Sequence, residues 1–363
     1  AYRIADNQTA TIAKWDYELL PVELKDLRQA DYDLDLLGFE SDELAHLLDG
    51  DIAQGLTDPD AVPEPPDDPI TQRGDIWLLG DHRLLCGDSA SRDEVDRLLD
   101  GAVIDLVDMD PPYNFGIEPR SSIAVEAMRG VEKNKWAHLR KQELSNGDKR
   151  GSRKKMRPND RRLTNDFISD SAFGEKVSAW FRNIARALKP GGTFYIWGGY
   201  ANLDDYLAPL AEAKLHLSQW IIWDKQHPSI VYNDFMAAFE VCFYGWREGA
   251  AHNFYGPSNA TDLWHVKKIP PQRMVHMTEK PVELAVRAIQ YSSLPGQRVL
   301  DLFGGSGSTL IAAEQTGRKS YLMEIDPLYC DIIANRWMQF TGRQATRIDS
   351  SGNRTTHTAP TSS

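Results

Sequence analysis

The sequence predicts an α/β fold, a seven-stranded doubly wound sheet preceded by a small helical extension. Two observations support this prediction. From Gly74 onward, short apolar runs alternate with segments of helical period, which is the pattern of a sheet covered by helices. The chain also has 363 residues, enough for one large α/β domain with attachments or for two domains of about 150 residues.

The N-terminal part is expected to lie outside the sheet. Residues 1–50 are acidic and carry apolar residues at helical spacing, with Ser41 a suitable helix N-cap. Residues 51–74 are rich in aspartate and proline, which favours an extended linker that cannot bury a core. The main domain is placed at 75–345, followed by a flexible tail at 346–363.

The seven expected strands of the main domain are 82–86, 103–107, 193–197, 217–223, 239–244, 299–302 and 320–325. Apolar residues of 177–188 share one helical face, and the helix should stop at Lys189-Pro190-Gly191-Gly192. A second helix is expected over 203–210. Because no helix-length pattern separates 217–223 from 239–244, these two strands should pair antiparallel at one sheet edge. Residues 117–170 form a long insertion, which in a compact domain is usually functional or disordered.

Charge is distributed unevenly along the chain. The net charge is −12, but residues 1–74 carry −13, the remainder carries +1, and residues 120–162 carry +9. A nucleic-acid partner, which needs a basic surface, is therefore compatible with the charge of the main domain. No stretch approaches the roughly 20 apolar residues of a membrane span, which excludes a membrane protein. Three isolated cysteines and no visible signal peptide fit a cytoplasmic protein without a disulfide framework or zinc site.

A glycine-rich loop follows the expected strand 299–302. Asp301 lies near the strand end, and the loop reads Phe303, Gly304, Gly305, Ser306, Gly307, Ser308 and Thr309 before an apolar helix. Glycines let the backbone approach a ligand, and the helix N-terminus offers free N–H groups. Glu324 ends the next strand, where a carboxylate can accept both hydroxyls of a ribose. The loop therefore predicts a nucleotide-type cofactor site, the alternative being a tight turn before a helix.

Three cofactors compete for this loop. A P-loop would need lysine where Ser308 stands, and a dinucleotide fingerprint would need a third glycine where Leu310 stands. S-adenosylmethionine remains, since it has no phosphate and its amino group needs an anionic partner such as Asp301.

A second motif, Asp110-Pro111-Pro112-Tyr113, follows the expected strand 103–107. Two prolines fix φ and remove two N–H donors, so rigid carbonyls stand beside a carboxylate and an aromatic ring. Asp110 and a proline carbonyl could accept both hydrogens of a planar amine while Tyr113 stacks on its ring. The alternative is a strand-to-loop turn. Ligands bind at the carboxyl ends of strands in doubly wound sheets, so strands 103–107 and 299–302 are expected to be neighbours.

Together these residues resemble the amino-group DNA methyltransferases in their permuted, β-class order, over about residues 74–340. Asp110 to Tyr113 resembles the catalytic motif, and Asp301 to Thr309 resembles the S-adenosylmethionine loop. Met277-Thr278-Glu279-Lys280-Pro281 resembles a segment near the cofactor, which assigns Thr278 and Lys280 to it. Gly87-Asp88-Ser89 resembles the strand end that meets the cofactor adenine, and Asp326 follows the ribose-binding Glu324. The head beginning at Tyr2 weakly resembles the end of a ParB-like module.

The resemblance implies a Rossmann-like sheet with S-adenosylmethionine as cofactor and double-stranded DNA as substrate. It implies direct methyl transfer to a base rotated out of the duplex, with neither a metal nor a covalent intermediate. Aspartate as the first motif residue favours the N6 of adenine, whereas serine there more often marks the N4 of cytosine. The family tends to form homodimers. The resemblance also implies a bacterial or phage-encoded protein that acts either with a cognate restriction enzyme or without one.

The region 245–277 is short for the usual target-recognition domain, so the basic insertion is expected to share DNA contact. Its candidate phosphate ligands are Arg153, Lys154, Lys155, Arg157, Arg161 and Arg162. The alternative is a solvated basic loop. Alternatives for the whole chain are a cytosine-N4 methyltransferase, a methyltransferase acting on RNA or protein glutamine, and a DNA-binding regulator without activity.

Overall fold

A computed structural model describes residues 52–113, 169–198, 204–229, 235–257, 259–269 and 279–359, with short pieces between 23 and 44. Its helices are the 3₁₀ helix η1 (Leu34–Leu37), α4 (Arg92–Leu99), α7 (Asp170–Ala187), α8 (Asp204–Glu212), α9 (Val282–Ser292), α10 (Ser308–Gln315) and α11 (Pro327–Thr341). Its strands are β1 (Ile76–Leu79), β2 (His82–Cys86), β3 (Ile104–Met109), β4 (Leu188–Gly198), β5 (Leu215–Ser229), β6 (Ala237–Arg247), β7 (Leu263–His265), β8 (Arg298–Asp301), β9 (Lys319–Glu324), β10 (Ala345–Ile348) and β11 (Arg354–His357).

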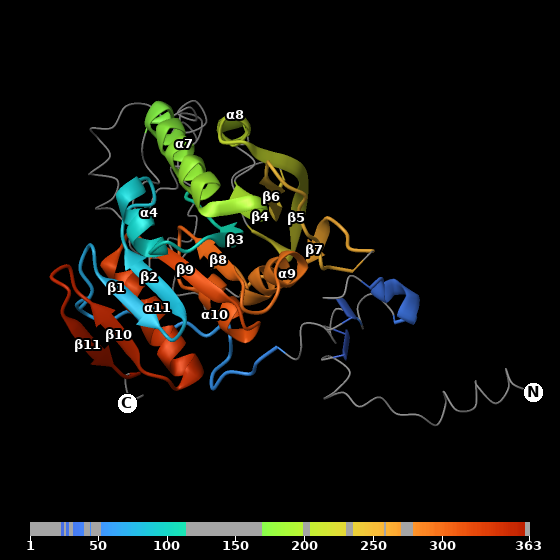
Figure 1. The fold of residues 1–363 in the computed structure, drawn as a ribbon. Coiled ribbons are helices and arrows are strands. Elements are labelled where there is room, and N and C mark those ends of the chain that lie inside the picture. Colours follow the sequence, from blue (N-terminus) through green and yellow to red (C-terminus); the bar gives the residue numbers. More distant parts are fainter. Residues whose placement is uncertain are drawn as a thin grey trace, which may run out of the picture.

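The strands form one mixed sheet in the order β11-β10-β1-β2-β9-β8-β3-β4-β6-β5-β7 (Figure 1). The α/β class is confirmed, and all seven expected strands are present. The expected strand number was wrong, because β1, β7, β10 and β11 are additional. Each has only three or four residues, and β10 and β11 alternate polar side chains on a mostly solvent-accessible edge, so they lack an apolar run.

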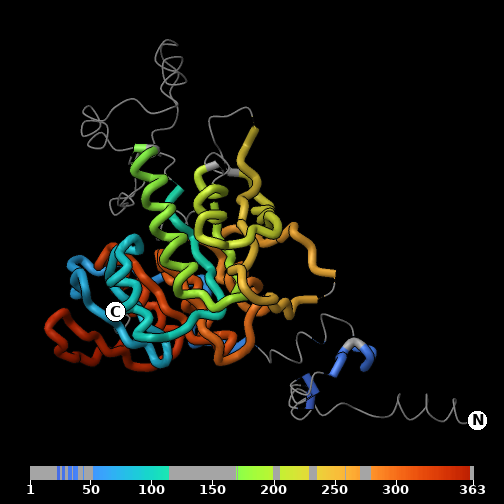
Figure 2. The backbone as a smooth tube through the Cα atoms, turned by 45° about the horizontal axis from the view of Figure 1, so that its top comes forward, coloured from blue at the N-terminus to red at the C-terminus, as the bar shows by residue number. Residues whose placement is uncertain are grey.

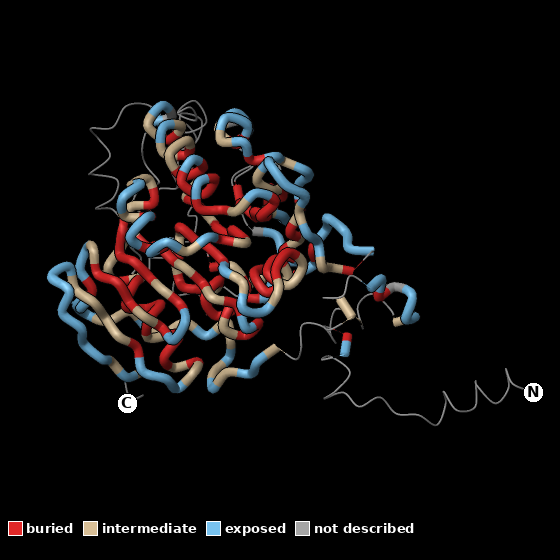
Figure 3. Tube along the Cα trace, in the orientation of Figure 1, coloured by how far each residue is buried: buried red, intermediate tan, exposed pale blue. Residues whose placement is uncertain are grey.

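Helices cover both faces of the sheet. Buried residues of α4, α7 and α8 pack in one hydrophobic cluster, and those of α9, α10 and α11 pack in two others. The central strands are accordingly buried along most of their length (Figure 3). When helices cover both faces of a sheet, the side chains on those faces pack in the core, and a ligand site can form only where the strands end.

The neighbour relation between the two motif-bearing strands is confirmed. β3 and β8 pair in parallel, with Leu106 opposite Val299 and Val107 opposite Leu300. β5 and β6 pair antiparallel as expected, although they are not the edge, since β7 lies outside β5 in parallel. Figure 2 shows that the start of α7 and the end of β5 reach the same side of the sheet as the end of β3.

The expected helix stop was placed too late. α7 ends at Ala187, and Leu188 already begins β4, so Lys189 to Gly192 lie within that strand. Gly192 is required there because a Cβ would stand 2.9 Å from the carbonyl oxygen of Asp105 on the adjacent strand. The β3–β4 register shifts at this point, between Ile104 and Leu106. A glycine in a strand marks such a close backbone approach.

The proline-rich segment has no helix or strand over residues 52–75, but it lies against the main domain. Ala53 donates its backbone N–H to Gln315 (2.8 Å), and Leu56 donates to Phe340 (2.8 Å). The carboxylate of Asp60 accepts the N–H of Val282 at 2.9 Å, at the start of α9. The segment is therefore anchored by backbone contacts, which its composition could not predict.

Among the described residues, no helix is both long and apolar enough to cross a membrane.

Candidate active site

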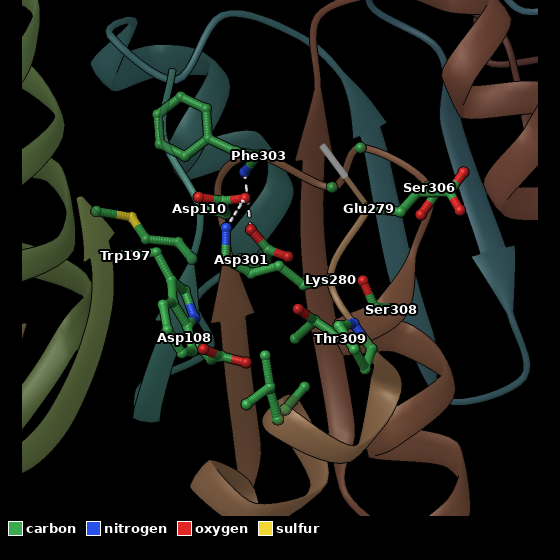
Figure 4. Close-up of a pocket in the computed structure, with 16 residues that line it drawn as sticks. Asp108, Asp110, Trp197, Glu279, Lys280, Asp301, Phe303, Ser306, Ser308 and Thr309 are labelled. Atoms are coloured by element: carbon green, nitrogen blue, oxygen red, sulfur yellow. Dashed lines mark hydrogen bonds and ion pairs between the residues drawn. The ribbon is translucent and has the colours of Figure 1, made fainter. Parts of the chain in front are cut away.

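A cleft of ≈ 550 Å³ opens where β3 and β8 end (Figure 4). Asp108 to Asp110 line it from the end of β3, and Asp301 and Phe303 line it from the end of β8. The adjacent walls are Trp197 of β4 and the segment from Glu279 into α9. The two motifs, far apart in the chain, therefore face one space because their strands are neighbours.

Most of the glycine-rich loop lines this cleft, namely Gly304, Gly305, Ser306, Ser308 and Thr309. Gly305 has φ +53° and Gly307 has φ +87°, backbone values that favour glycine. Gly307 does not line the cleft: a Cβ there would stand 3.3 Å from Ile333 of α11. Its role is to turn the chain into α10, for which it is the N-cap.

The carboxylate of Glu324 supports the loop from the end of β9. Its Oε2 accepts the N–H of Gly305 at 2.8 Å, and its Oε1 accepts the N–H of Asp326 at 2.9 Å. Asp326 is the N-cap of α11, and its Oδ1 accepts the N–H of Leu328 at 2.9 Å. The position expected for a ribose-binding carboxylate is thus tied directly to the glycine loop, and Asp326 has a helix-capping role.

Asp88 and Ser89 follow β2, beside the ends of β8 and β9. The hydroxyl of Ser89 donates to the carbonyl oxygen of Leu302 at 2.5 Å, and Gly87 donates its N–H to the carbonyl of Glu324 at 2.9 Å. Asp88 Oδ1 accepts the N–H of Ala90 at 3.0 Å. These residues adjoin the loop but do not line the cleft itself.

In the catalytic motif, the side chains of Asp110 and Tyr113 meet. The Tyr113 hydroxyl donates to Asp110 Oδ1 at 2.5 Å, and the Lys280 ammonium donates to Asp110 Oδ2. Pro111 is buried and Pro112 half-buried between them. Lys280, which the resemblance assigned to the cofactor, therefore contacts the Asp110 carboxylate and also lines the cleft wall.

Several residues of the site were not predicted, and they come from the middle strands. The Glu240 carboxylate on β6 lies 3.1 Å from Lys280 Nζ, and Lys225 on β5 lies 2.7 Å from the other Glu240 oxygen. Trp197 donates a hydrogen bond to Asp108. These residues belong to no local motif, and antiparallel pairing of β6 with β4 and β5 brings them to the cleft.

The cleft is rich in buried carboxylates whose ionisation is disfavoured. Burial, reinforced by Asp301, raises the pKa of Asp108 to about 8. Burial raises the pKa of Asp301 to about 7, although hydrogen bonds from Phe303 and Thr309 oppose it. Burial likewise raises the pKa of Glu324 to about 7. A cationic ligand would favour the ionised forms of these groups, whereas a phosphate would be repelled by them. The charge of the site thus suits the sulfonium and amino groups of S-adenosylmethionine.

Some expected site residues lie outside the described part of the chain. They are Thr278 and the six basic residues of the insertion, Arg153, Lys154, Lys155, Arg157, Arg161 and Arg162. Within the described residues, no group of three or more His, Cys, Asp or Glu side chains is arranged to hold a metal ion.

The chain matches two family models. The model described as DNA methylase matches residues 104–335, which include both motifs. The model described as the ParB-methyltransferase HTH domain matches residues 18–73. The second match covers residues 18–50 of the acidic head and continues through the proline-rich segment to residue 73.

Curated proteins and solved structures give similar matches. The type II methyltransferase M2.DpnII of Streptococcus pneumoniae is 26% identical over 189 residues, covering 47% of this chain and 70% of that protein. The type II methyltransferase M.HpaI of Haemophilus parainfluenzae is 24% identical over 278 residues, covering 70% and 74%. A structure of M1.HpyAVI with S-adenosylmethionine aligns with TM-score 0.48 and 17% identity over 70% of this chain and 97% of that chain. The cytosine-N4-specific PvuII methyltransferase aligns with TM-score 0.47 and 16% identity over 70% and 86%.

Proposed function

The chain belongs to the DNA methylase family, and we propose that it transfers a methyl group from S-adenosylmethionine to the exocyclic N6 of adenine in double-stranded DNA. The observation that carries this proposal is the single cleft in which Asp110 faces the glycine-rich loop. Adenine is proposed because the catalytic motif begins with aspartate. The N4 of cytosine is the alternative acceptor.

The cofactor fits the residues that line the cleft. When bound, S-adenosylmethionine supplies an electrophilic methyl group on a sulfonium. Asp301, at the end of β8, holds the cationic amino group, and the raised pKa of this carboxyl means that the cation must draw it into its ionised form. Glu324 accepts the ribose hydroxyls while it keeps Gly305 in position.

The target amine is oriented by the catalytic motif. Asp110 and the carbonyl of Pro111 accept the two amine hydrogens, which turns the nitrogen lone pair toward the methyl group, while Tyr113 stacks on the base. S-adenosylmethionine would supply the methyl group from its sulfonium, and the surplus proton on the methylated nitrogen would pass to the carboxylate of Asp110. Burial raises the pKa of Asp110, although Lys280 opposes the shift, so this carboxylate is a better proton acceptor than an exposed one. Rate enhancement then rests on positioning and on hydrogen bonds to the developing charge.

The exocyclic amine of a paired base is not accessible to a cleft of this kind, so the base must leave the stack first. We propose that the enzyme acts as a homodimer, either with a cognate restriction enzyme or alone. We also propose that the basic residues between Arg153 and Arg162 contact DNA phosphates while the base leaves the stack. Reversing several of these basic charges should weaken DNA binding and flatten its dependence on salt concentration. An unchanged salt slope would remove the insertion from the interface.

A tritium-transfer assay with methyl-labelled S-adenosylmethionine tests the reaction on DNA, RNA and protein. The expected result is label in DNA only, released on digestion as N6-methyl-2′-deoxyadenosine. N4-methylcytosine would overturn the choice of base, and label in RNA or protein would overturn the substrate class. Asp110→Asn should abolish transfer, whereas Asp81→Asn, the same change at an exposed turn, should leave it unchanged. Transfer retained by Asp110→Asn would refute the role of this carboxylate.

A further inference from the structure

Four charged side chains of alternating sign lie in a row beside the cleft: Asp110, Lys280, Glu240 and Lys225. Lys280 Nζ donates to Asp110 Oδ2 and lies 3.1 Å from Glu240 Oε2. Lys225 Nζ lies 2.7 Å from Glu240 Oε1. The side chains of Lys280 and Lys225 are only 10% and 11% exposed, so these contacts are shielded from water. The proposed reaction assigns a role to Asp110 but none to Glu240 or Lys225.

Both carboxylate oxygens of Asp110 already accept hydrogen bonds from this chain. Tyr113 donates to Oδ1 and Lys280 donates to Oδ2. The Lys280 ammonium also lies 3.1 Å from the Tyr113 hydroxyl and 5.4 Å from the centre of the Tyr113 ring. If Asp110 orients the target amine, as the proposed function requires, the amine must approach a carboxylate whose two oxygens already accept hydrogen bonds from Tyr113 and Lys280. The base and the lysine therefore compete for this carboxylate.

Lys280 cannot leave Asp110 without another anionic partner. Burial would favour the neutral amine, but Asp110 and Glu240 outweigh it and raise the pKa of Lys280, so the side chain stays charged. An ammonium moved into an apolar environment without a partner is strongly disfavoured. Glu240 Oε2 is close enough to receive it with a small rotation, and the Trp197 ring, 5.2 Å from Nζ, forms a side of the same site.

We propose that Lys280 occupies the place of the target amine on Asp110 in the empty enzyme, and that Glu240 receives its ammonium when the base enters. Lys225 Nζ forms an ion pair with the other oxygen of Glu240, and its positive charge weakens the attraction of this carboxylate for Lys280. Glu240 is thus a positioning residue, which acts on the base through Lys280. The inference rests on the proposed function, because it needs an amine acceptor at Asp110.

The test compares substitutions at the two ends of this row. The probe is a duplex that contains the site methylated by the wild-type enzyme. The target base keeps its amine, and 2-aminopurine replaces the base next to it, so that fluorescence reports extrusion. Glu240→Gln should lower extrusion and raise the KM for DNA by about ten- to hundredfold, the usual worth of one charge-assisted hydrogen bond. Lys225→Met should act in the opposite direction, because it frees Glu240 for Lys280. Glu248→Gln, the same change at an exposed position just after β6, is the matched control.

A double substitution separates this role from a structural one. Lys280→Met removes the competing ammonium, so Glu240→Gln/Lys280→Met should extrude the base better than Glu240→Gln alone. Equal losses in Glu240→Gln and Lys225→Met, or absence of rescue in the double variant, would each overturn the inference. Wild-type enzyme that transfers no methyl group to DNA would instead refute the proposed function, and the inference with it.

Discussion

Asp108 offers a direct test of the electrostatics of the cleft, because the charge of this carboxylate is strongly disfavoured. The side chain is 3% exposed, and its pKa is raised from 3.8 to about 8, first by burial and then by Asp301. A carboxyl whose pKa is higher in the folded than in the unfolded protein stabilises the fold below the lower pKa. That contribution is lost as the pH rises toward the upper one.

The size of the effect follows from the two pKa values. Between pH 4 and 8 the folded protein retains a proton that the unfolded chain has released, so each pH unit costs about 1.4 kcal/mol of stability. Asp108→Asn does not titrate and should keep the hydrogen bond from Trp197. The stability difference between variant and wild type should therefore grow by about 3 kcal/mol from pH 5.5 to pH 8.

Urea unfolding of the cofactor-free protein at several pH values measures this difference. Asp81→Asn is the control, since that side chain is 75% exposed and stays hydrated in both states. A difference between Asp108→Asn and wild type that does not change between pH 5.5 and 8 would refute the assigned electrostatics.

Three further predictions concern the glycine-rich loop and its supports. Affinity for S-adenosylmethionine should fall below pH 7 as Asp301 becomes protonated. In calorimetric titrations, Asp301→Asn should bind the cofactor more weakly, and its affinity should change less with pH, by the equivalent of one proton. Arg336→Met should cost about 2–3 kcal/mol in urea unfolding, because Arg336 is buried and donates to the carbonyl oxygen of Ser306 at 2.8 Å; a loss below about 0.5 kcal/mol would contradict this. Gly307→Ala should lower the free energy of unfolding by about 1–2 kcal/mol, because alanine is disfavoured at the positive φ of this position. Gly307→Ala/Ile333→Val should be no more stable than Gly307→Ala. Recovered stability in the double variant would show instead that crowding against Ile333 is the cause.

The strand ends that carry the two motifs could be predicted because each is an apolar run followed directly by residues with unusual backbone or charge. Asp110 and Asp301 were identified in this way, and the placement of their strands as neighbours is confirmed. Their positions in the site, like those of Asp88, Ser89 and Glu324, remain predictions that cofactor binding must test. The sequence pattern located strand ends better than it located helix ends, as the early end of α7 at Ala187 shows.

The residues that were not predicted have in common that their contacts come from distant parts of the chain. Antiparallel pairing of β5 and β6 brings Lys225 to Glu240, and Glu240 contacts Lys280, the partner of Asp110. Neither Glu240 nor Lys225 has a neighbour in the chain that reveals its role. The short strands β1 and β10 pair with each other and with β2 and β11, respectively, and segments of four residues are too short to show a periodicity. The proline-rich segment is held by individual hydrogen bonds of its backbone and of side chains such as Asp60, and composition carries no information about those.

The order of the strands has a consequence for how the protein folds. β3 to β7 pair with one another in a local unit, whereas β2 pairs with β9 and β1 pairs with β10, with Ile76 opposite Ile348. Contacts of such long sequence separation form slowly, and during synthesis they must wait for the last part of the chain. The cleft needs both β3, which is made early, and β8, which is made late. A chain still growing on the ribosome can therefore complete its middle strands long before it can bind a cofactor.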